Sequence, residues 1–331
     1  MTVISPYRRL YDVELTPVSG ARFQPTGFPD IGAARFSYPV RDNGSVSWKD
    51  ALIVESAQSM ANRLEAVGWD TAAQQPVPEF DGLPYVRVTA ADDGRYIASS
   101  RTEAHRLASA YVKDSQIDGQ DAKLLIRERL GLRDDTPLAP RDIARSIMAL
   151  DPLCLVHGVF FAEKSGVWPG QPKIARALTA FIEAIGIRDA VSGGVKRDQV
   201  RHGLGEGGGT QEGYGFVPYH RVEYTAERIV AHFSVDTAQI AAYGLGEAGA
   251  GLLETIALWE IRSLLDGGLR LRTACDLAPA TAVTDRSGAP LPPRDELAAA
   301  LRGLIGRCAE LLGDGEPIQA VWNLGKKKRG S

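Results

Sequence analysis

The stretch LLETIALWEIRSLLDGGLRLRTACD, residues 252–276, decides much of the fold that we expect. Its first part, 252–265, is apolar on nearly all sides and is followed by two glycines, which predicts a buried helix with a glycine cap. Its second part, 269–276, alternates between apolar side chains on one side and Arg270 and Arg272 on the other, as in a half-buried strand. We therefore expect an α+β fold.

Further strands and helices are expected along the rest of the chain. Apolar patterns predict strands at residues 11–18, 84–89, 153–162, 222–243 and 317–322. Capping boxes, a proline at a helix start and helical spacing predict helices at residues 47–67, 100–112, 172–185 and 295–312. Residues 116–146 are charged and interrupted by prolines, which indicates an irregular or short-helical insertion. His157 is interpreted as a satisfied core histidine rather than a ligand.

Composition restricts the class of protein. With 331 residues and 44% hydrophobic content, the chain can bury a sizeable core as one elaborated domain or two smaller ones. The formal net charge is only -3, so a nucleic-acid site has to be a local stripe of cations. Three widely spaced cysteines without a CxxC pattern indicate a reducing compartment and no structural zinc. No apolar leader or spanning segment is present, so we expect a cytoplasmic protein without membrane contact or cofactor.

A glycine-rich arm is expected at residues 192–215, SGGVKRDQVRHGLGEGGGTQEGYG. Its backbone buries too little apolar surface to offset the entropy of ordering it, so a partner should order it. Its first half carries Lys196, Arg197, Arg201 and His202, and flexible cationic backbone is typical of an arm that closes over phosphates. A solvated surface loop is the alternative.

Two further groups of candidate RNA-binding residues lie in the first third of the chain. Arg22, Gln24 and Phe28 belong to a loop with prolines, where they either contact bases or fix the loop to its own core. Asn62 and Arg63 lie on the polar side of the helix expected at 47–67, which is either a backbone-contact surface or an ordinary solvated face.

Cationic pairs complete the candidate set. Arg101 and His105 are four residues apart and share one face of the helix expected at 100–112. Arg270 and Arg272 share one strand face, as a phosphate track or as a salt-bridged cover for the core. The basic stretch 326–329 could touch nucleic acid, but such tails are more often solvated.

One motif indicates a different class of protein. Gly244, Gly246 and Gly249 fit the dinucleotide-binding pattern G-x-G-x-x-G after a strand, with Asp276 at the place of a ribose-binding acid. The expected strand alternates, however, unlike a central parallel strand, and few residues follow Asp276. A dinucleotide-binding oxidoreductase therefore remains an alternative. The signatures of serine hydrolases, zinc peptidases, P-loops and EF-hands are not found in the sequence.

Six segments together resemble one known family, the RAMP backbone proteins of type I-G (formerly I-U) CRISPR systems, the family-seven subunit of crRNA-guided surveillance complexes. The segments are RFQPTGFPDIGAA (22–34), SMANRLE (59–65), SSRTEAHRL (99–107), GGVKRD (193–198), HRVEYTA (220–226) and LRLRTACDL (269–277). They follow the family order over most of the chain, with weaker coverage at 116–146 and near the C-terminus.

The resemblance implies a ferredoxin-like, RRM-like palm that uses the whole chain, 1–331, as one elaborated domain. It also implies a finger or helical insertion at 99–170, with residues 192–215 as a thumb-like arm and 324–331 as a basic flexible tail.

The same resemblance implies a non-catalytic, crRNA-binding subunit of a type I Cascade complex for antiviral defence. Its partners would be crRNA, the target DNA strand paired to the guide, copies of itself in a helical filament, other complex subunits and a recruited helicase-nuclease. RAMP relatives in other CRISPR types cut RNA through a loop aspartate, so a ribonuclease that uses Asp198 is a further alternative.

Overall fold

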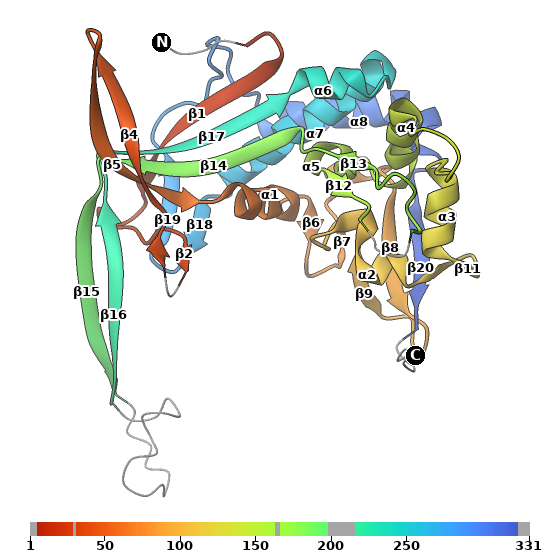
Figure 1. The fold of residues 1–331 in the computed structure, drawn as a ribbon, viewed down its shortest axis with the longest axis horizontal. Coiled ribbons are helices and arrows are strands. Elements are labelled where there is room, and N and C mark those ends of the chain that lie inside the picture. Colours follow the sequence, from red (N-terminus) through yellow and green to blue (C-terminus); the bar gives the residue numbers. More distant parts are fainter. Residues whose placement is uncertain (1–4, 29–30, 163–165, 198–215, 324–331) are drawn as a thin grey trace, which may run out of the picture.

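The computed structural model describes residues 5–28, 31–162, 166–197 and 216–323. Two sheets and the helices packed on them form the body (Figure 1). All pairs in the main sheet are antiparallel. Its strands, in spatial order, are β18 (Leu269–Arg272), β19 (Cys275–Pro279), β1 (Arg8–Pro17), β17 (Arg228–Asp236), β14 (Leu178–Ile185), β5 (Ser45–Glu55) and β4 (Arg35–Asp42).

Two helices cover one face of this sheet. Helix α1 (Ala57–Ala66) lies between β1 and β14 in the chain, and α7 (Gly246–Asp266) lies between β17 and β18. Helix α1 packs against β14 and α7, and α7 packs against β17, so both helices lie on the same face. Helix α7 buries Leu252, Ile256 and Trp259, because nearly its whole circumference is apolar.

The second sheet forms a lobe at the other end of the molecule. In it β20, near the end of the chain, pairs in parallel with β8. The strands, in order, are β11 (Gln120–Asp121), β10 (Gln116–Ile117), β20 (Pro317–Trp322), β8 (Tyr85–Ala90) and β9 (Tyr96–Ser99). The nearby helices are α2 (Ala110–Lys113), α3 (Ala122–Arg129), α4 (Pro140–Leu150), α5 (Leu153–His157), α8 (Arg294–Arg307) and α9 (Ala309–Leu312).

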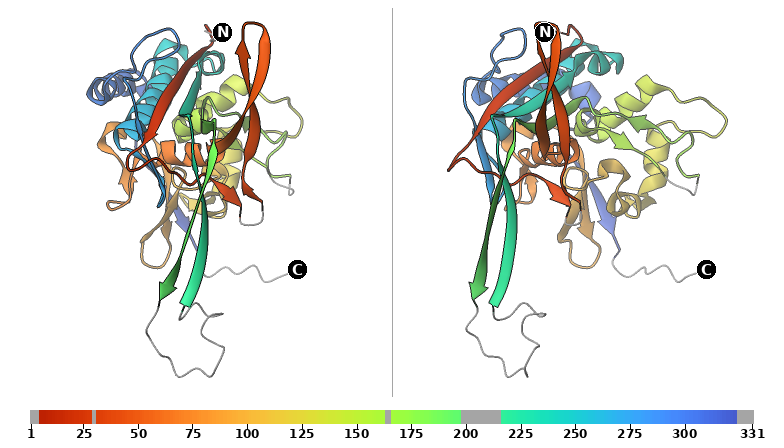
Figure 2. Two further views of the ribbon diagram at one scale, coloured as in Figure 1. Left: turned by 90° about the vertical axis from the view of Figure 1, so that its left-hand side faces the viewer. Right: turned by 60° about the vertical axis from the view of Figure 1, so that its left-hand side comes forward.

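A long two-stranded ribbon leaves the body. Its strands are β15 (Arg188–Arg197) and β16 (Phe216–Thr225), and it extends away from the sheets in every view (Figures 1 and 2). The smaller elements are the strand pairs β2 (Gly27–Phe28) with β3 (Gly32–Ala33), β6 (Trp69–Asp70) with β7 (Gln75–Pro76) and β12 (Val159–Phe160) with β13 (Lys173–Ile174), the 3-10 helices η1 (Pro78–Phe80) and η2 (Arg106–Ala108), and helix α6 (Thr237–Ala242).

The mixed helix-and-sheet class is confirmed, with mostly antiparallel sheets. The strands expected at 11–18, 84–89 and 317–322 and the helices expected at 252–265 and 295–312 are all present. Residues 222–243 begin as the end of β16 and β17, as expected, but finish as α6. No helix in the described part of the chain is long and apolar enough to span a membrane.

The helix expected at 47–67 is wrong over its first half. Residues 45–55 form β5, which is hydrogen-bonded between β4 and β14 and buries Leu52 and Val54. The helix begins only after Ser56, whose side chain accepts a hydrogen bond from the Ser59 N–H at 3.3 Å. Sheet pairing on both sides outweighs the local capping signal at Ser47 because it satisfies the backbone and buries β-branched side chains.

Three other expected elements are also corrected. Residues 153–162 form α5 and then the short β12, and residues 172–185 form β13 and β14 instead of a helix. Short apolar runs fit a buried helix and a buried strand equally well, so tertiary pairing decides between them. The expected strand 269–276 is the hairpin β18–β19, with a turn at Thr273 and Ala274.

The helix expected at 100–112 is mostly a turn followed by η2 and α2. Arg106 has a φ of 51°, in the left-handed region, which a continuous right-handed helix cannot contain. Consequently Arg101 and His105 do not share a helix face.

Candidate nucleic-acid interface

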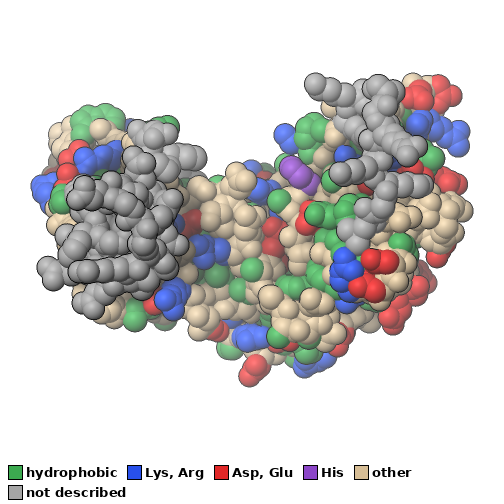
Figure 3. Space-filling model, turned by 90° about the horizontal axis from the view of Figure 1, so that it is seen from below, with side chains coloured by type: hydrophobic (Ala, Val, Ile, Leu, Met, Phe, Trp, Pro, Cys, Tyr) green, Lys and Arg blue, Asp and Glu red, His purple; other side chains and the backbone are tan. Residues whose placement is uncertain are grey.

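A groove of about 840 Å³ lies between the N-terminus of α1, residues 104–113 and the β12–β13 pair. In Figure 1 these elements lie between the ribbon and the lobe. The molecule seen from the side toward which the ribbon points is hollowed between its two ends, with Lys, Arg and a few acidic side chains along the hollow (Figure 3). The groove is therefore open to an extended ligand.

Basic side chains line this groove from two separate segments. His105 and Lys113 come from the η2–α2 region, and Lys173 and Arg176 come from β13 and the residues after it. We call these four residues the groove cations. None of the described residues that line the groove is acidic. The positive charge is therefore not neutralised locally, and it favours a polyanion.

The groove cations make no ion pair with any described residue. Lys173 Nζ lies 5.6 Å from the ring centroid of Phe160, which is 47% exposed. Burial and the neighbouring positive charge of Arg106 lower the pKa of Arg176. The charge of Glu65 opposes this shift. An anion that binds in the groove would stabilise the charged forms of these side chains.

Arg106 also lines the groove but is already paired. Its Nε and Nη2 donate to the two carboxylate oxygens of Glu65 at 2.6 and 2.7 Å, and its Nη1 donates to the Gly158 carbonyl at 3.0 Å. This bidentate pair lies below the groove surface, with both side chains about nine-tenths buried. Arg106 therefore ties α1 to the segment before β12.

Arg101 is buried, contrary to the expectation that it lies on a basic helix surface. Its Nη2 donates to the Leu83 and Pro84 carbonyls at 3.0 and 3.1 Å, and its Nε is 3.6 Å from Asp151 Oδ1. The guanidinium stacks over the ring of Tyr85 at 5.0 Å. Only His105 of the expected pair is exposed and lines the groove.

Arg63 and Arg272 converge on one buried carboxylate, Glu55, and we call these three residues the Glu55 cluster. Glu55 is 2% exposed; Arg272 is in hydrogen-bond contact with it, and Arg63 Nη2 is 3.8 Å away. Arg272 also donates to the Gln24 carbonyl at 2.7 Å. Arg270 is exposed, but its carbonyl accepts from Arg63. For Arg272, the interpretation as part of a phosphate track is wrong. The alternative, a salt bridge that covers the core, is confirmed.

The remaining candidate residues lie elsewhere. Arg22 is exposed and pairs with Glu223 of β16 at 3.2 Å, so it supports the root of the ribbon. Asn62 is exposed on α1 beside a second pocket. Lys196 and Arg197 end β15, and Phe28 belongs to β2, but their side chains lie outside the described part. Arg201 and His202 lie outside the described residues.

Sequence reasoning missed Lys113, Lys173 and Arg176 as members of one site. Lys113 is separated from Lys173 and Arg176 by several elements, and the three belong to no common motif. The sequence signal was limited to two basic residues inside the misassigned 172–185 segment. His157, in contrast, is buried as expected, with Nε2 2.8 Å from Glu260 Oε2, but its Nδ1 has no hydrogen-bond partner among the described residues, so only one ring nitrogen is satisfied.

Residues 10–189 match the model of the family described as CRISPR-associated protein GSU0053. The chain belongs to this family. The matched region contains all four groove cations as well as Glu55 and Arg63. No curated protein sequence matches the chain.

Two solved structures are similar to this family member over most of its length. One, described as a CRISPR RNA-guided surveillance complex, pre-nicking, has 15% identity over 95% of this chain and 89% of that chain, with a TM-score of 0.39. The other, a CRISPR RNA-guided surveillance complex, has 12% identity over 95% and 86%, with a TM-score of 0.34. These scores are too low to establish a common fold.

The glycine motif lacks its expected context in this CRISPR-associated chain. Helix α6 stands between β17 and Gly244, so the glycines do not follow a strand directly. The sheet beside them is antiparallel, unlike the parallel sheet of dinucleotide-binding folds. In the described part of the chain, no group of three or more His, Cys, Asp and Glu side chains could hold a metal ion.

Proposed function

We propose that the chain is a non-catalytic, guide-RNA-binding backbone subunit of a type I CRISPR surveillance complex. The observation that carries this proposal is the groove, where Lys113, Lys173, Arg176 and His105 lie without an acidic neighbour among the described lining residues. Phosphates of a single RNA strand lie along the groove cations, and Gln58 and Phe160 supply a hydrogen bond and an apolar surface. Backbone contacts carry no sequence information, so base pairing of the guide supplies specificity.

The course of the main sheet supports a ferredoxin-like RAMP palm. Strands β19, β1, β17 and β14 are neighbours, while the chain visits them as β1, α1, β14, β17, α7 and then β18–β19. This is the order of a β-α-β-β-α-β unit with both helices on one face. The proposal takes residues 99–170 as the finger, 192–215 as the thumb and 324–331 as a flexible basic tail.

The ribbon supports a filament. It extends away from the body at the end opposite the lobe, so each copy presents two different ends to its neighbours (Figure 2). Contacts between unlike surfaces do not close into a pair but continue along a line. In the proposed type I-G complex, copies stack head to tail along the guide, and the thumb with Lys196, Arg197 and Arg201 reaches along the RNA. The paired target DNA strand, other subunits and a helicase-nuclease complete the assembly.

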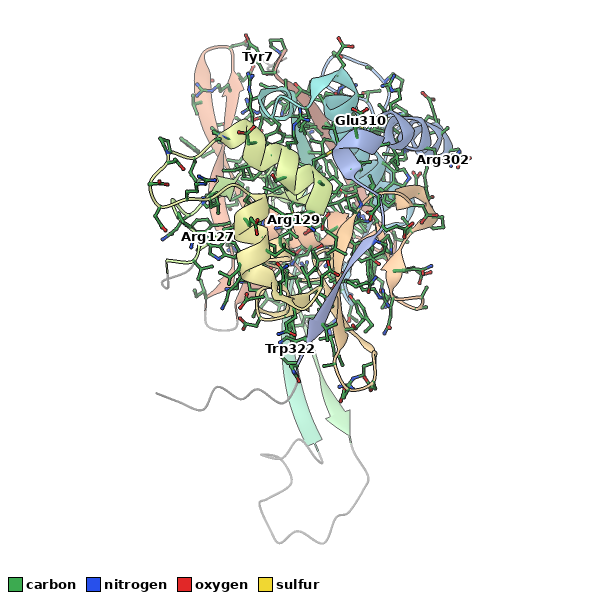
Figure 4. The ribbon with its side chains drawn as sticks, turned by 90° about the vertical axis from the view of Figure 1, so that its right-hand side faces the viewer. Tyr7, Arg127, Arg129, Arg302, Glu310 and Trp322 are labelled. Carbon is green, nitrogen blue, oxygen red and sulfur yellow. The ribbon has the colours of Figure 1, made fainter. Side chains whose placement is uncertain are left out.

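The groove is tested by replacing Lys113, Lys173 and Arg176 together with Ala. The salt dependence of binding to a single-stranded RNA, measured by fluorescence anisotropy, should flatten by about 0.7 for each phosphate that is no longer neutralised, or about 2 in all. The matched control replaces Arg129, Arg302 and Arg307, which are exposed on the far side of the lobe; Figure 4 shows the first two. Equal slopes for the wild type and the groove variant would contradict the proposal, as would equal flattening in both variants.

The absence of catalysis is part of the same proposal. Target RNA paired to the guide should remain intact when it is incubated with the assembled complex and Mg²⁺. Metal-dependent cutting that disappears on Asp198→Asn would replace this proposal with a RAMP ribonuclease.

A further inference from the structure

A second pocket of about 320 Å³ adjoins the groove, and Ala104 lines both. Its volume lies in the range of small-molecule sites. Its lining combines one aromatic ring, Trp69, with polar side chains that both donate and accept hydrogen bonds, among them Asn62, Arg101 and Glu103.

Trp69 is held in place by two other rings. Its ring lies 5.9 Å from that of Tyr85, edge to face, and 5.8 Å from that of Tyr96. Tyr96 is itself covered by the guanidinium of Arg87 at 4.8 Å. A half-buried ring that is fixed in this way offers apolar area at little entropic cost, as base-stacking aromatics do.

Arg101, which lines the pocket, carries buried donors without hydrogen-bond partners. Its side chain is only 2% exposed, yet Nε and Nη1 have no hydrogen-bond partner among the described residues; the Asp151 carboxylate is 3.6 Å from Nε. Donors buried without acceptors are costly to the fold unless a ligand or water meets them. The guanidinium can therefore donate to a carbonyl or ring nitrogen of a ligand.

Glu103 supplies the complementary acceptor. Its side chain is half-buried and makes no hydrogen bond or ion pair with any described residue. Burial raises its pKa, against the opposing charge of His105, which is the effect expected of a partly desolvated carboxylate. A carboxylate accepts readily from an exocyclic amino group, as it does from the amine of cytosine.

We propose that this pocket binds one nucleobase that carries an amino group, supplied by the RNA strand in the groove. The base stacks on Trp69, donates its amino group to Glu103 and accepts from Arg101. That the base comes from an RNA strand rests on the proposed function. The recognition of the base is argued from the residues that line the pocket.

The test compares bases that differ at one position. Oligocytidine and oligouridine 12-mers differ at C4 of the base, where cytosine has an amino group and uracil a carbonyl oxygen. The wild-type protein should bind oligocytidine about fivefold more tightly or better. Glu103→Gln should abolish this preference, because an amide can donate to the uracil oxygen. Trp69→Phe should weaken both oligomers, whereas Trp48→Ala, on the exposed β4–β5 hairpin, should change neither.

A second arm separates the pocket from the groove. Cytidine 5′-monophosphate, titrated alone, should quench tryptophan fluorescence in the wild type but much less in Trp69→Phe, and it should bind at least about tenfold more weakly than the 12-mer. Binding as tight as that of the 12-mer would make the pocket a free-nucleotide site and overturn the strand source. Equal affinity of the wild type for both 12-mers would overturn the base assignment and leave the proposed function intact. An unchanged salt slope in the groove variant would contradict the proposed function alone. Cytidine 5′-monophosphate would still quench the tryptophan fluorescence in that case.

Discussion

The Glu55 cluster and the groove both contain basic side chains, but only those of the cluster are paired with a carboxylate. In the cluster, Arg63 and Arg272 share one carboxylate that is 2% exposed, so their positive charge is compensated inside the fold. In the groove, His105, Lys113, Lys173 and Arg176 form no ion pair with a described carboxylate. The difference teaches that a basic residue becomes a candidate for binding a ligand only when no acidic neighbour has already paired with it.

The strongest test removes a cation that is already paired. Arg106→Ala should destabilise the fold by about 3–5 kcal/mol, because it leaves the Glu65 carboxylate buried without its bidentate partner. Urea unfolding measures the change. Lys173→Ala, an exposed groove cation, is the control and should stay within about 0.5 kcal/mol. Similar destabilisation in both variants would erase the distinction between the two regions.

Neutralising Glu55 tests the difference between the cluster and the groove through the carboxylate of the cluster. Glu55→Gln should cost about 1–3 kcal/mol, because the two guanidiniums lose the charge that compensates their partial burial. Thermal unfolding measures the change. Glu310→Gln on α9, labelled in Figure 4, is an exposed control that should unfold like the wild type. An unchanged unfolding temperature for Glu55→Gln would mean that the cluster is as solvated as the groove.

Replacing the basic residues of the glycine-rich arm adds a third region to the comparison of the cluster with the groove. Lys196, Arg197 and Arg201 changed together to Ala should flatten the salt dependence of RNA binding by about 0.7 for each phosphate that the arm neutralises. Anisotropy at several salt concentrations gives the slope. A slope equal to that of the wild type would exclude the arm from the binding site and leave the groove as the candidate.

The smallest effect concerns pH. Burial lowers the pKa of His157, but the charge and hydrogen bond of Glu260, together with the charge of Glu65, outweigh it, and the net shift is upward from 6.5. The stability that this pair contributes is therefore complete below that value and is lost as the pH rises through the raised pKa. Burial also raises the pKa of Glu260, which acts in the same direction. Unfolding free energy should fall as the pH rises above 6.5, and His157→Gln should flatten that fall.

The sequence predicted those elements whose pattern has a single solution. Helix 252–265 is too long and too apolar for anything but a buried helix, and β17 alternates with Ile229, Ala231 and Phe233 inward. Segment 172–185 failed because spacing that suits a helix also places Leu178, Ala180 and Ile182 on one face of a strand. Pairing with β17 and β5 decided it, and pairing is a property of the whole fold.

Only part of the candidate interface was within reach of the sequence. His105 was identified, but through a helix that does not exist. Arg101 and Arg272 pair with carboxylates inside the fold. Their partners, Asp151 and Glu55, lie far away in the sequence, so the sequence could not show the pairing. A motif reflects neighbours along the chain, whereas the state of a cation depends on neighbours in space.

The parallel pairing of β20 with β8 places a constraint on the order of synthesis. Strand β8 leaves the ribosome long before β20, its partner on one side, so the nascent lobe carries an open strand edge until residues 317–322 have been made. Open edges recruit other strands. A chain released before Pro317 should therefore aggregate through β8.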